Sequence, residues 1–203
     1  MEKIDRNKTF RKMSIENLVN QINTYCTLSE ADVEIIESKF AHNSFKSKEF
    51  ILRQGQISNQ IHFVETGLVR IFHLNEGKEV TTYLSSDNGF VSSYSSFLYQ
   101  TRSYENIQCL ENSETFSINY KDMQSLYELV PGWQKIGRIL AEQNVLCLTD
   151  RLLKLQSVPA KEKYIEFLKT SPEKIVKRTP LIHVASYLGI TPESLSRIRK
   201  EIS

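Results

Sequence analysis

The chain has 203 residues, is 40% hydrophobic and carries a formal net charge of +2 at pH 7. This length supports one large domain or a medium and a small one, and the composition excludes a disordered or fibrous protein. The chain contains no run of 18 apolar residues, and its charged N-terminal segment MEKIDRNKTFRKM is not followed by an apolar segment. We therefore expect a cytoplasmic protein that does not contact a membrane.

The three cysteines are Cys26, Cys109 and Cys147, an odd number that is widely spaced and lacks a C-x-x-C pair. This pattern favours neither a disulfide framework nor a zinc or iron-sulfur site. We expect three buried free thiols, and we expect no metal and no resident cofactor.

Residues 14–41 are predicted to form short packing helices. Leu18, Val19 and Ile22 recur at helical spacing in the first part of this segment. Ser29 is the expected N-cap of a second helix that contains Val33 and Ile36.

From Ser44 to Tyr120 the sequence consists of short apolar or alternating runs such as IHFVETG, LVRIFHL and EVTTYLS. Turn signals separate the runs, among them residues 75–78 and 86–89. The regular spacing predicts an antiparallel sandwich or roll.

A helix-rich stretch follows from Lys121, in which Ile139, Leu146 and Leu153 repeat every seven residues. A long helix that is apolar on more than one side needs cover from outside its own domain. We therefore expect a homodimer through residues of about 133–155. A long helix that is buried wholly within one subunit is the alternative.

Pro159 is expected to end this helix and to begin a separate small helical unit. From Pro159 onward the chain carries nine basic and five acidic residues, a net charge of +4, which leaves −2 on the first 158 residues. A basic segment on a slightly acidic body favours an anionic partner, although solvated helix faces would produce the same imbalance.

The stretch IHVASYLGITPESLSRIRKEI, residues 182–202, predicts two short helices that meet at a turn. Gly189 suits a left-handed helix end, Thr191 suits an N-cap, and Pro192 suits the first helical position. This spacing is typical of a helix-turn-helix unit. The packing residues are expected to be Val184, Ala185 and Leu188 on the first helix and Leu195, Ile198 and Ile202 on the second.

The opposite face of the second helix carries side chains that suit the DNA major groove. Arg197 can bind guanine with two hydrogen bonds, and Glu193 can accept from cytosine N4, whereas Lys200 and serines can reach phosphates. The alternative is an ordinary helical hairpin with a solvated basic face. The candidate DNA-binding residues are Thr191, Glu193, Ser194, Ser196, Arg197 and Lys200.

In the order of these segments the chain resembles the Crp/Fnr family of bacterial transcription regulators over nearly its whole length. Gly55, Gly67, Gly77 and Gly89 stand at the turn positions of the family's sensor domain. The resemblance implies an α+β fold in three parts. Residues 1–130 would form an antiparallel β-roll, the jelly roll of cyclic nucleotide-binding domains, with flanking N-terminal helices. Residues 131–157 would form a long dimerisation helix, and residues 158–203 an all-α helix-turn-helix domain.

The family also implies function. A protein of this kind would bind double-stranded operator DNA as a homodimer and regulate transcription, and RNA polymerase stays open as a further partner. An effector pocket is implied at Ser92, Ser93, Arg102, Ser103, Leu146 and Cys147.

In relatives that bind cyclic AMP, a glutamate holds the ribose, and Ser93 stands at its position here. Arg102 and Ser103 match the phosphate-binding pair, while Leu146 and Cys147 stand where relatives offer hydroxyl groups to the base. Without a carboxylate the ribose hydroxyls would be poorly paired, at a cost of about 1–3 kcal/mol. We therefore expect an unidentified effector rather than cyclic AMP. Alternatively, Arg102 is a surface residue on a hairpin turn.

Two other classes of function compete with this interpretation. A metalloenzyme of the cupin kind would use His62, His73 and Glu65, but the sequence has neither an H-x-H pair nor a recognisable catalytic motif, so we expect no enzyme. The other class is a ligand-binding or protein-interaction β-roll that no longer binds DNA.

Overall fold

The computed structural model describes residues 6–202 and the side chains of residues 15–202; residues 1–5, the start of the charged N-terminal segment, lie outside the described residues. The helices are α1 Arg6–Asn23, α2 Glu30–Lys39, α3 Tyr94–Tyr99, α4 Tyr120–Leu129, α5 Trp133–Ser157, α6 Ala160–Thr170, α7 Glu173–Arg178, α8 Leu181–Tyr187 and α9 Pro192–Ile202. The strands are β1 Ala41–Phe45, β2 Phe50–Leu52, β3 Gln60–Thr66, β4 Leu68–Asn75, β5 Lys78–Ser86, β6 Gly89–Val91, β7 Glu105–Cys109 and β8 Ser113–Asn119.

The strands form two antiparallel four-stranded sheets, in the orders β1-β8-β3-β6 and β2-β7-β4-β5. Apolar residues from both sheets, among them Val64, Ile71 and Ile107, form the core between them. At the tip of the β4–β5 hairpin, Glu76 and Gly77 both have positive φ, as a two-residue type I′ turn requires. The predicted α+β fold with a jelly-roll domain is thus confirmed, including the turn at 75–78.

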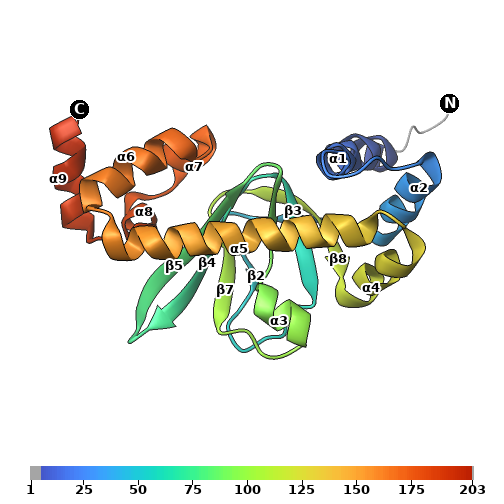
Figure 1. The fold of residues 1–203 in the computed structure, drawn as a ribbon, viewed down its shortest axis with the longest axis horizontal. Coiled ribbons are helices and arrows are strands. Elements are labelled where there is room, and N and C mark those ends of the chain that lie inside the picture. The colour runs from blue at the N-terminus through green and yellow to red at the C-terminus, as the bar shows by residue number, and fades with distance from the viewer. Residues whose placement is uncertain (1–5, 203) are drawn as a thin grey trace.

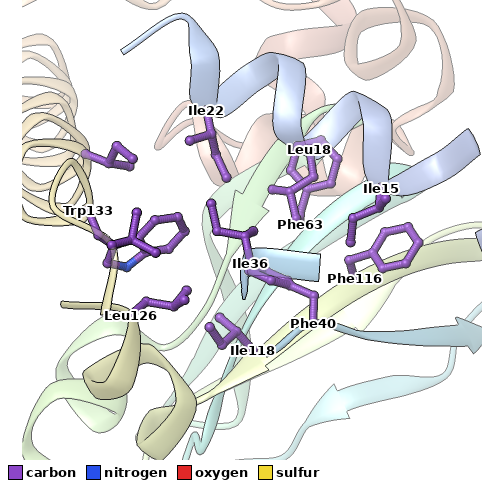
Figure 2. Packing of buried hydrophobic residues seen from close by; sticks show 12 residues of the cluster. Ile15, Leu18, Ile22, Ile36, Phe40, Phe63, Phe116, Ile118, Leu126 and Trp133 are labelled. Atoms are coloured by element: carbon purple, nitrogen blue, oxygen red, sulfur yellow. The ribbon is translucent and has the colours of Figure 1, made fainter. Parts of the chain in front are cut away.

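The N-terminal helices cover the sheet that contains β3 and β8 (Figure 1). Figure 2 shows Ile36 of α2 and Leu126 of α4 among the apolar side chains that surround Phe63 and Phe116 of the sheet. As predicted, Ser29 is the N-cap of α2, and its side chain forms a reciprocal capping box with Asp32. The helical segment expected to reach residue 41 ends earlier, because Ala41–Phe45 pairs with β8 as strand β1.

The short helix α3 lies between β6 and β7, in a stretch for which the sequence predicted no element, and its residues Ser96 and Phe97 are buried. The expectation of three buried thiols is wrong, because only Cys109 is buried, whereas Cys26 is partly exposed and Cys147 is exposed.

Helix α5 runs across the roll and joins it to the C-terminal helices (Figure 1). Its residues Val145, Leu146, Leu148, Leu152 and Leu153 are between 51% and 69% exposed. The alternative of a helix buried wholly within one subunit is therefore wrong. No helix within residues 6–202 is long and apolar enough to span a membrane.

Helices α6 to α9 form a small bundle that begins directly after Pro159, as predicted. The bundle packs on its own β-roll, because Leu68 of β4 and Leu84 of β5 share one apolar cluster with Ile175, Val184 and Leu188. The position of α9 relative to the β-roll is therefore set by contacts within one chain.

Candidate nucleic-acid interface and effector pocket

The turn between α8 and α9 has the predicted geometry. Gly189 has a φ of +66°, and the N–H of Ile190 donates to the Ala185 carbonyl at 3.0 Å, which closes the end of α8. The Thr191 hydroxyl accepts from the backbone N–H of Ser194 at 3.1 Å and so caps α9. Thr191 and Ser194 are thus engaged with each other at the start of α9.

The packing face of α9 is shorter than predicted. Leu195 and Ile198 are buried with Val184 and Ala185 of α8, as expected. Ile202, the last residue of α9, is 37% exposed instead.

The opposite face of α9 presents Glu193, Ser196, Arg197 and Lys200 to solvent. The side chains of Arg197 and Lys200 make no hydrogen bond or ion pair with any residue in the described part of the chain. A hydrogen bond from its own backbone N–H, together with Thr191 and the nearby Arg197, lowers the pKa of Glu193, so its carboxylate stays ionised. The face therefore holds accessible donors and one acceptor. Arg199, which sequence reasoning did not select, is also exposed.

The candidate effector residues Ser93 and Ser103 lie together inside the roll. The Ser103 hydroxyl donates to Ser93 Oγ at 2.9 Å, and the Ser93 hydroxyl donates to Glu105 Oε2 at 2.6 Å. The Ser103 Oγ also accepts from the backbone N–H of Glu105 at 2.9 Å. Both serines are almost completely buried. Their hydroxyl groups are therefore already paired.

The expectation that this pocket lacks a carboxylate is wrong. The family resemblance places an acidic residue only at the position of Ser93. In the structure the carboxylate comes instead from Glu105 of strand β7, which accepts a hydrogen bond from Ser93. Ser103 precedes β7, and its hydroxyl bonds to the backbone of Glu105, so Glu105 is placed beside the serines by a local contact that the sequence pattern did not indicate.

The other four candidate effector residues make no hydrogen bond with Ser93 or Ser103 among the described contacts. Arg102 is exposed, and its backbone forms an isolated bridge with Ile57. The Ser92 hydroxyl donates to the Gln60 carbonyl at 3.1 Å. Leu146 is exposed on α5, and Cys147 lines a different cleft, between α5 and the C-terminal helices.

The histidines of the roll do not meet. His62 lies in β3 and His73 in β4, which belong to different sheets. His62 is buried beside Thr115, and this burial lowers its pKa to about 4. Within residues 6–202, no three His, Cys, Asp or Glu residues are grouped as metal ligands would be.

A buried arginine joins the roll to the first helix of the helix-turn-helix unit. The Arg70 side chain is only 4% exposed, and its guanidinium lies 2.7 Å from Glu79 and donates to Gln108 on β7. Its Nη1 lies 2.9 Å from Nδ1 of His183 on α8. Because arginine can only donate, Nδ1 of His183 must be the acceptor. Burial and the neighbouring Arg70 lower the pKa of His183, which agrees with a neutral ring.

Hydrogen bonds on either side of Arg70 complete this interface. The backbone N–H of Thr81 donates to Ser186 Oγ at 2.9 Å. Lys174 of α7 lies 2.6 Å from Asp87 and 3.0 Å from Glu111, and Arg178 also pairs with Glu111. None of these contacts was predicted from the sequence.

Comparison with known proteins finds a similarity that covers the β-roll. Residues 42–129 match the family described as the cyclic nucleotide-binding domain. A search of curated protein sequences found no significant match.

Solved structures extend the likeness to most of the chain. FixK2 from Bradyrhizobium japonicum has 15% identity and a TM-score of 0.68, over 80% of this chain and 84% of its own. The c-di-GMP responsive global regulator CLP from Xanthomonas campestris has 17% identity and a TM-score of 0.67, over 86% of this chain and 91% of its own. The catabolite activator protein of Thermus thermophilus has 18% identity and a TM-score of 0.54, over 90% of this chain and 86% of its own. Residues 42–129 are thus similar to cyclic nucleotide-binding domains, and the chain shares its fold with these three solved structures.

Proposed function

We propose that the protein is a DNA-binding transcription regulator of the Crp/Fnr type, which binds operator DNA as a homodimer through α9 under the control of a small effector. The observation that carries this conclusion is the exposed face of α9, where Arg197 and Lys200 have no partner among the described residues. A capped helix that presents unpaired cations is suited to enter a major groove. RNA polymerase is the further partner that such a regulator would contact, and no catalytic role is assigned.

Arg197 is the principal base contact in this proposal, with Glu193 one turn before it. Removing an arginine that forms two hydrogen bonds to guanine typically costs about 1–3 kcal/mol per half-site and relaxes the preference at one base pair. Removing a phosphate contact weakens binding to all sequences alike and lowers the salt dependence.

The test uses the operator recovered by genome-wide mapping of bound sites and a non-specific duplex of equal length. Arg197→Ala should lose affinity mainly for the operator, whereas Lys200→Ala should lose affinity for both duplexes and show a smaller salt slope. An equal loss on both duplexes for Arg197→Ala would make Arg197 a phosphate contact. Absence of any shift with genomic DNA would favour a β-roll module that does not bind DNA.

The exposed leucines of α5 support the homodimer. Leu146 and Leu153 lie seven residues apart on this helix, as in a coiled-coil seam, and both are more than half exposed. Sedimentation at micromolar concentration should show twice the 23.6 kDa chain mass. A single 23.6 kDa species would exclude the dimer, and a Leu146→Glu, Leu153→Glu variant should produce that species.

Cyclic AMP is not the effector in this proposal. The resemblance places a ribose-binding glutamate where the chain has Ser93, and the carboxylate that is present, that of Glu105, is already bonded to Ser93. A ribose diol would have to break this pair before it could bind. Calorimetric titration should therefore give no micromolar or tighter dissociation constant for cyclic AMP, and such a constant would refute this part of the proposal.

A further inference from the structure

A second cleft lies away from the serines of the roll, between the C-terminal half of α5, helices α6 and α7, and strand β5. Its volume is about 280 Å³. Leu84 of the roll, Phe167 of α6 and Leu188, directly after α8, contribute apolar surface. All three parts of the chain thus meet at this cleft.

The charged residues of the cleft are unevenly paired. Lys154 lies 2.5 Å from both Asp150 and Glu166, so the two carboxylates of the lining are engaged by one ammonium group. The Lys163 ammonium donates to the Leu155 carbonyl at 3.0 Å. The lining therefore has three cations against two anions.

Lys163 and Arg151 are the two cations of the lining that pair with no carboxylate among the described residues. Of the two, Arg151 is the one with an unpaired buried donor. Its Nη2 donates only to the carbonyls of Thr81 and Tyr187, at 3.3 and 3.2 Å, and its guanidinium lies over the Tyr187 ring. Its Nε is buried and has no hydrogen-bond partner within the described residues. An unpaired donor in a partly buried charged group is unfavourable, and an anion in the cleft would offset this by pairing with the accessible part of the guanidinium.

We propose that this cleft binds a small organic anion, whose acidic group pairs with Arg151 and whose apolar part lies against Leu84, Phe167 and Leu188. A guanidinium fits a carboxylate, sulfonate or phosphate group with parallel hydrogen bonds. A bound molecule would contact the roll, the long helix and the C-terminal bundle at once. This site is separate from the serine pocket, and its occupation does not depend on DNA binding.

The test uses the full chain without DNA and two probes that differ in charge. Naphthalene-1-sulfonate carries an anionic group on an apolar ring system, and naphthalene-1-sulfonamide has the same rings without the charge. In calorimetric titration the sulfonate should bind at one site per chain, about tenfold or more tighter than the sulfonamide, as a charge-assisted hydrogen bond predicts. Equal affinities for the two probes would overturn the proposal.

Two variants locate the site by opposite effects. Arg151→Gln should weaken sulfonate binding by about tenfold or more and leave the sulfonamide unchanged. Glu166→Gln should tighten sulfonate binding by about two- to fivefold, because Lys154 loses a competing carboxylate at a partly exposed position. The matched control is Arg138→Gln on the same helix, where Arg138 pairs with Glu142 away from the cleft. Its affinity for both probes should equal that of the unaltered chain.

Arg151 also contacts the roll, so its replacement could disturb the fold. Circular dichroism and thermal unfolding of each variant distinguish that case. If Arg151→Gln is unfolded, the Glu166→Gln variant tests the proposal instead. A variant whose fold is disturbed would not bind the sulfonate more tightly than the unaltered chain does. Unchanged or weaker sulfonate affinity in Glu166→Gln would then overturn the proposal.

Discussion

Two sets of helices cover the β-roll, and they use different chemistry. Helices α1, α2 and α4 cover the sheet with β3 and β8 through apolar side chains such as Ile36, Leu126 and Phe63 (Figure 2). Helices α7 and α8 cover the β4–β5 hairpin of the other sheet, where a small apolar cluster is surrounded by Arg70, His183 and other polar groups.

The apolar and the polar contacts of the β-roll should respond differently to salt. Apolar burial is not weakened by electrostatic screening, whereas ion pairs weaken as salt screens them. We infer that the N-terminal helices are a permanent part of the β-roll domain. The C-terminal bundle has the kind of contact that a change in charge or ligand can release.

The largest expected effect is on the apolar side. Phe63→Ala should lower the free energy of unfolding by about 3–5 kcal/mol, because it leaves a cavity where a completely buried ring had packed. Urea denaturation measures this change, and Tyr99→Ala, at a site that is 77% exposed, should stay within about 0.5 kcal/mol. A loss below 1 kcal/mol for Phe63→Ala would contradict the assignment of this core.

Two histidines are desolvated, His62 between the two sheets and His183 on the side covered by the C-terminal bundle, and acid should distinguish them. The pKa of His62 is lowered from 6.5 to about 4, so between these values the unfolded chain binds a proton that the folded chain does not. The free energy of unfolding should therefore fall by up to about 3 kcal/mol as the pH decreases from 6.5 to 4, with no further contribution from His62 outside this range.

Urea denaturation at a series of pH values gives the measurement. His62→Gln keeps a polar group near Thr115 and should remove most of the fall. His183→Gln should remove a smaller part, because His183 is only half buried. The same pH profile in His62→Gln and the unaltered chain would show that His62 is not the source.

Arg70 is the expected centre of the polar side. Arg70→Met should reduce stability by about 2 kcal/mol, since Glu79 is largely exposed and only part of a buried-pair loss applies. The loss should be local, with faster proteolysis of residues 158–180 and unchanged fluorescence of Trp133, the single tryptophan, in the apolar cluster. Arg138→Gln, at an exposed pair, is the control. A shift in the Trp133 spectrum would mean that the two covered sides are not independent.

The smallest effect should come from the ion pairs of α7. Lys174→Gln removes the partner of Asp87 and Glu111 and should weaken docking of the bundle by about 1 kcal/mol or less at low salt. Protease sensitivity of the variant and the unaltered chain should become alike at 1 M salt. Lys177→Gln, on the same helix, pairs only with Glu173 among the described residues and should change nothing at either salt concentration. If Lys174→Gln differs equally at both salt concentrations, the contact is not electrostatic.

Local features of this fold were predictable from sequence. The caps of α2 and α9 and the turns at Gly77 and Gly189 depend on residues within a few positions of each other, and each was confirmed. The serine pocket was only partly predictable, because the pairing of Ser93 with Glu105 depends on how distant strands are placed.

The polar contacts between the β-roll and the C-terminal bundle were not predictable from sequence. Arg70 and His183 are separated by 113 positions, and neither residue has a sequence neighbour that indicates its partner. Likewise, the unpaired Nε of Arg151 can be recognised only once β5 and α8 are known to lie beside α5.

The division of α9 into two faces has a consequence for how this protein can evolve. Leu195 and Ile198 hold the helix, while Glu193, Ser196 and Arg197 are exposed and have no packing role. Exposed substitutions away from caps usually change stability by no more than about 0.5 kcal/mol. A lineage can therefore exchange Ser196 and Arg197, which lie beyond the cap, and with them the chemical groups that α9 presents to solvent, while the fold that presents them is inherited intact.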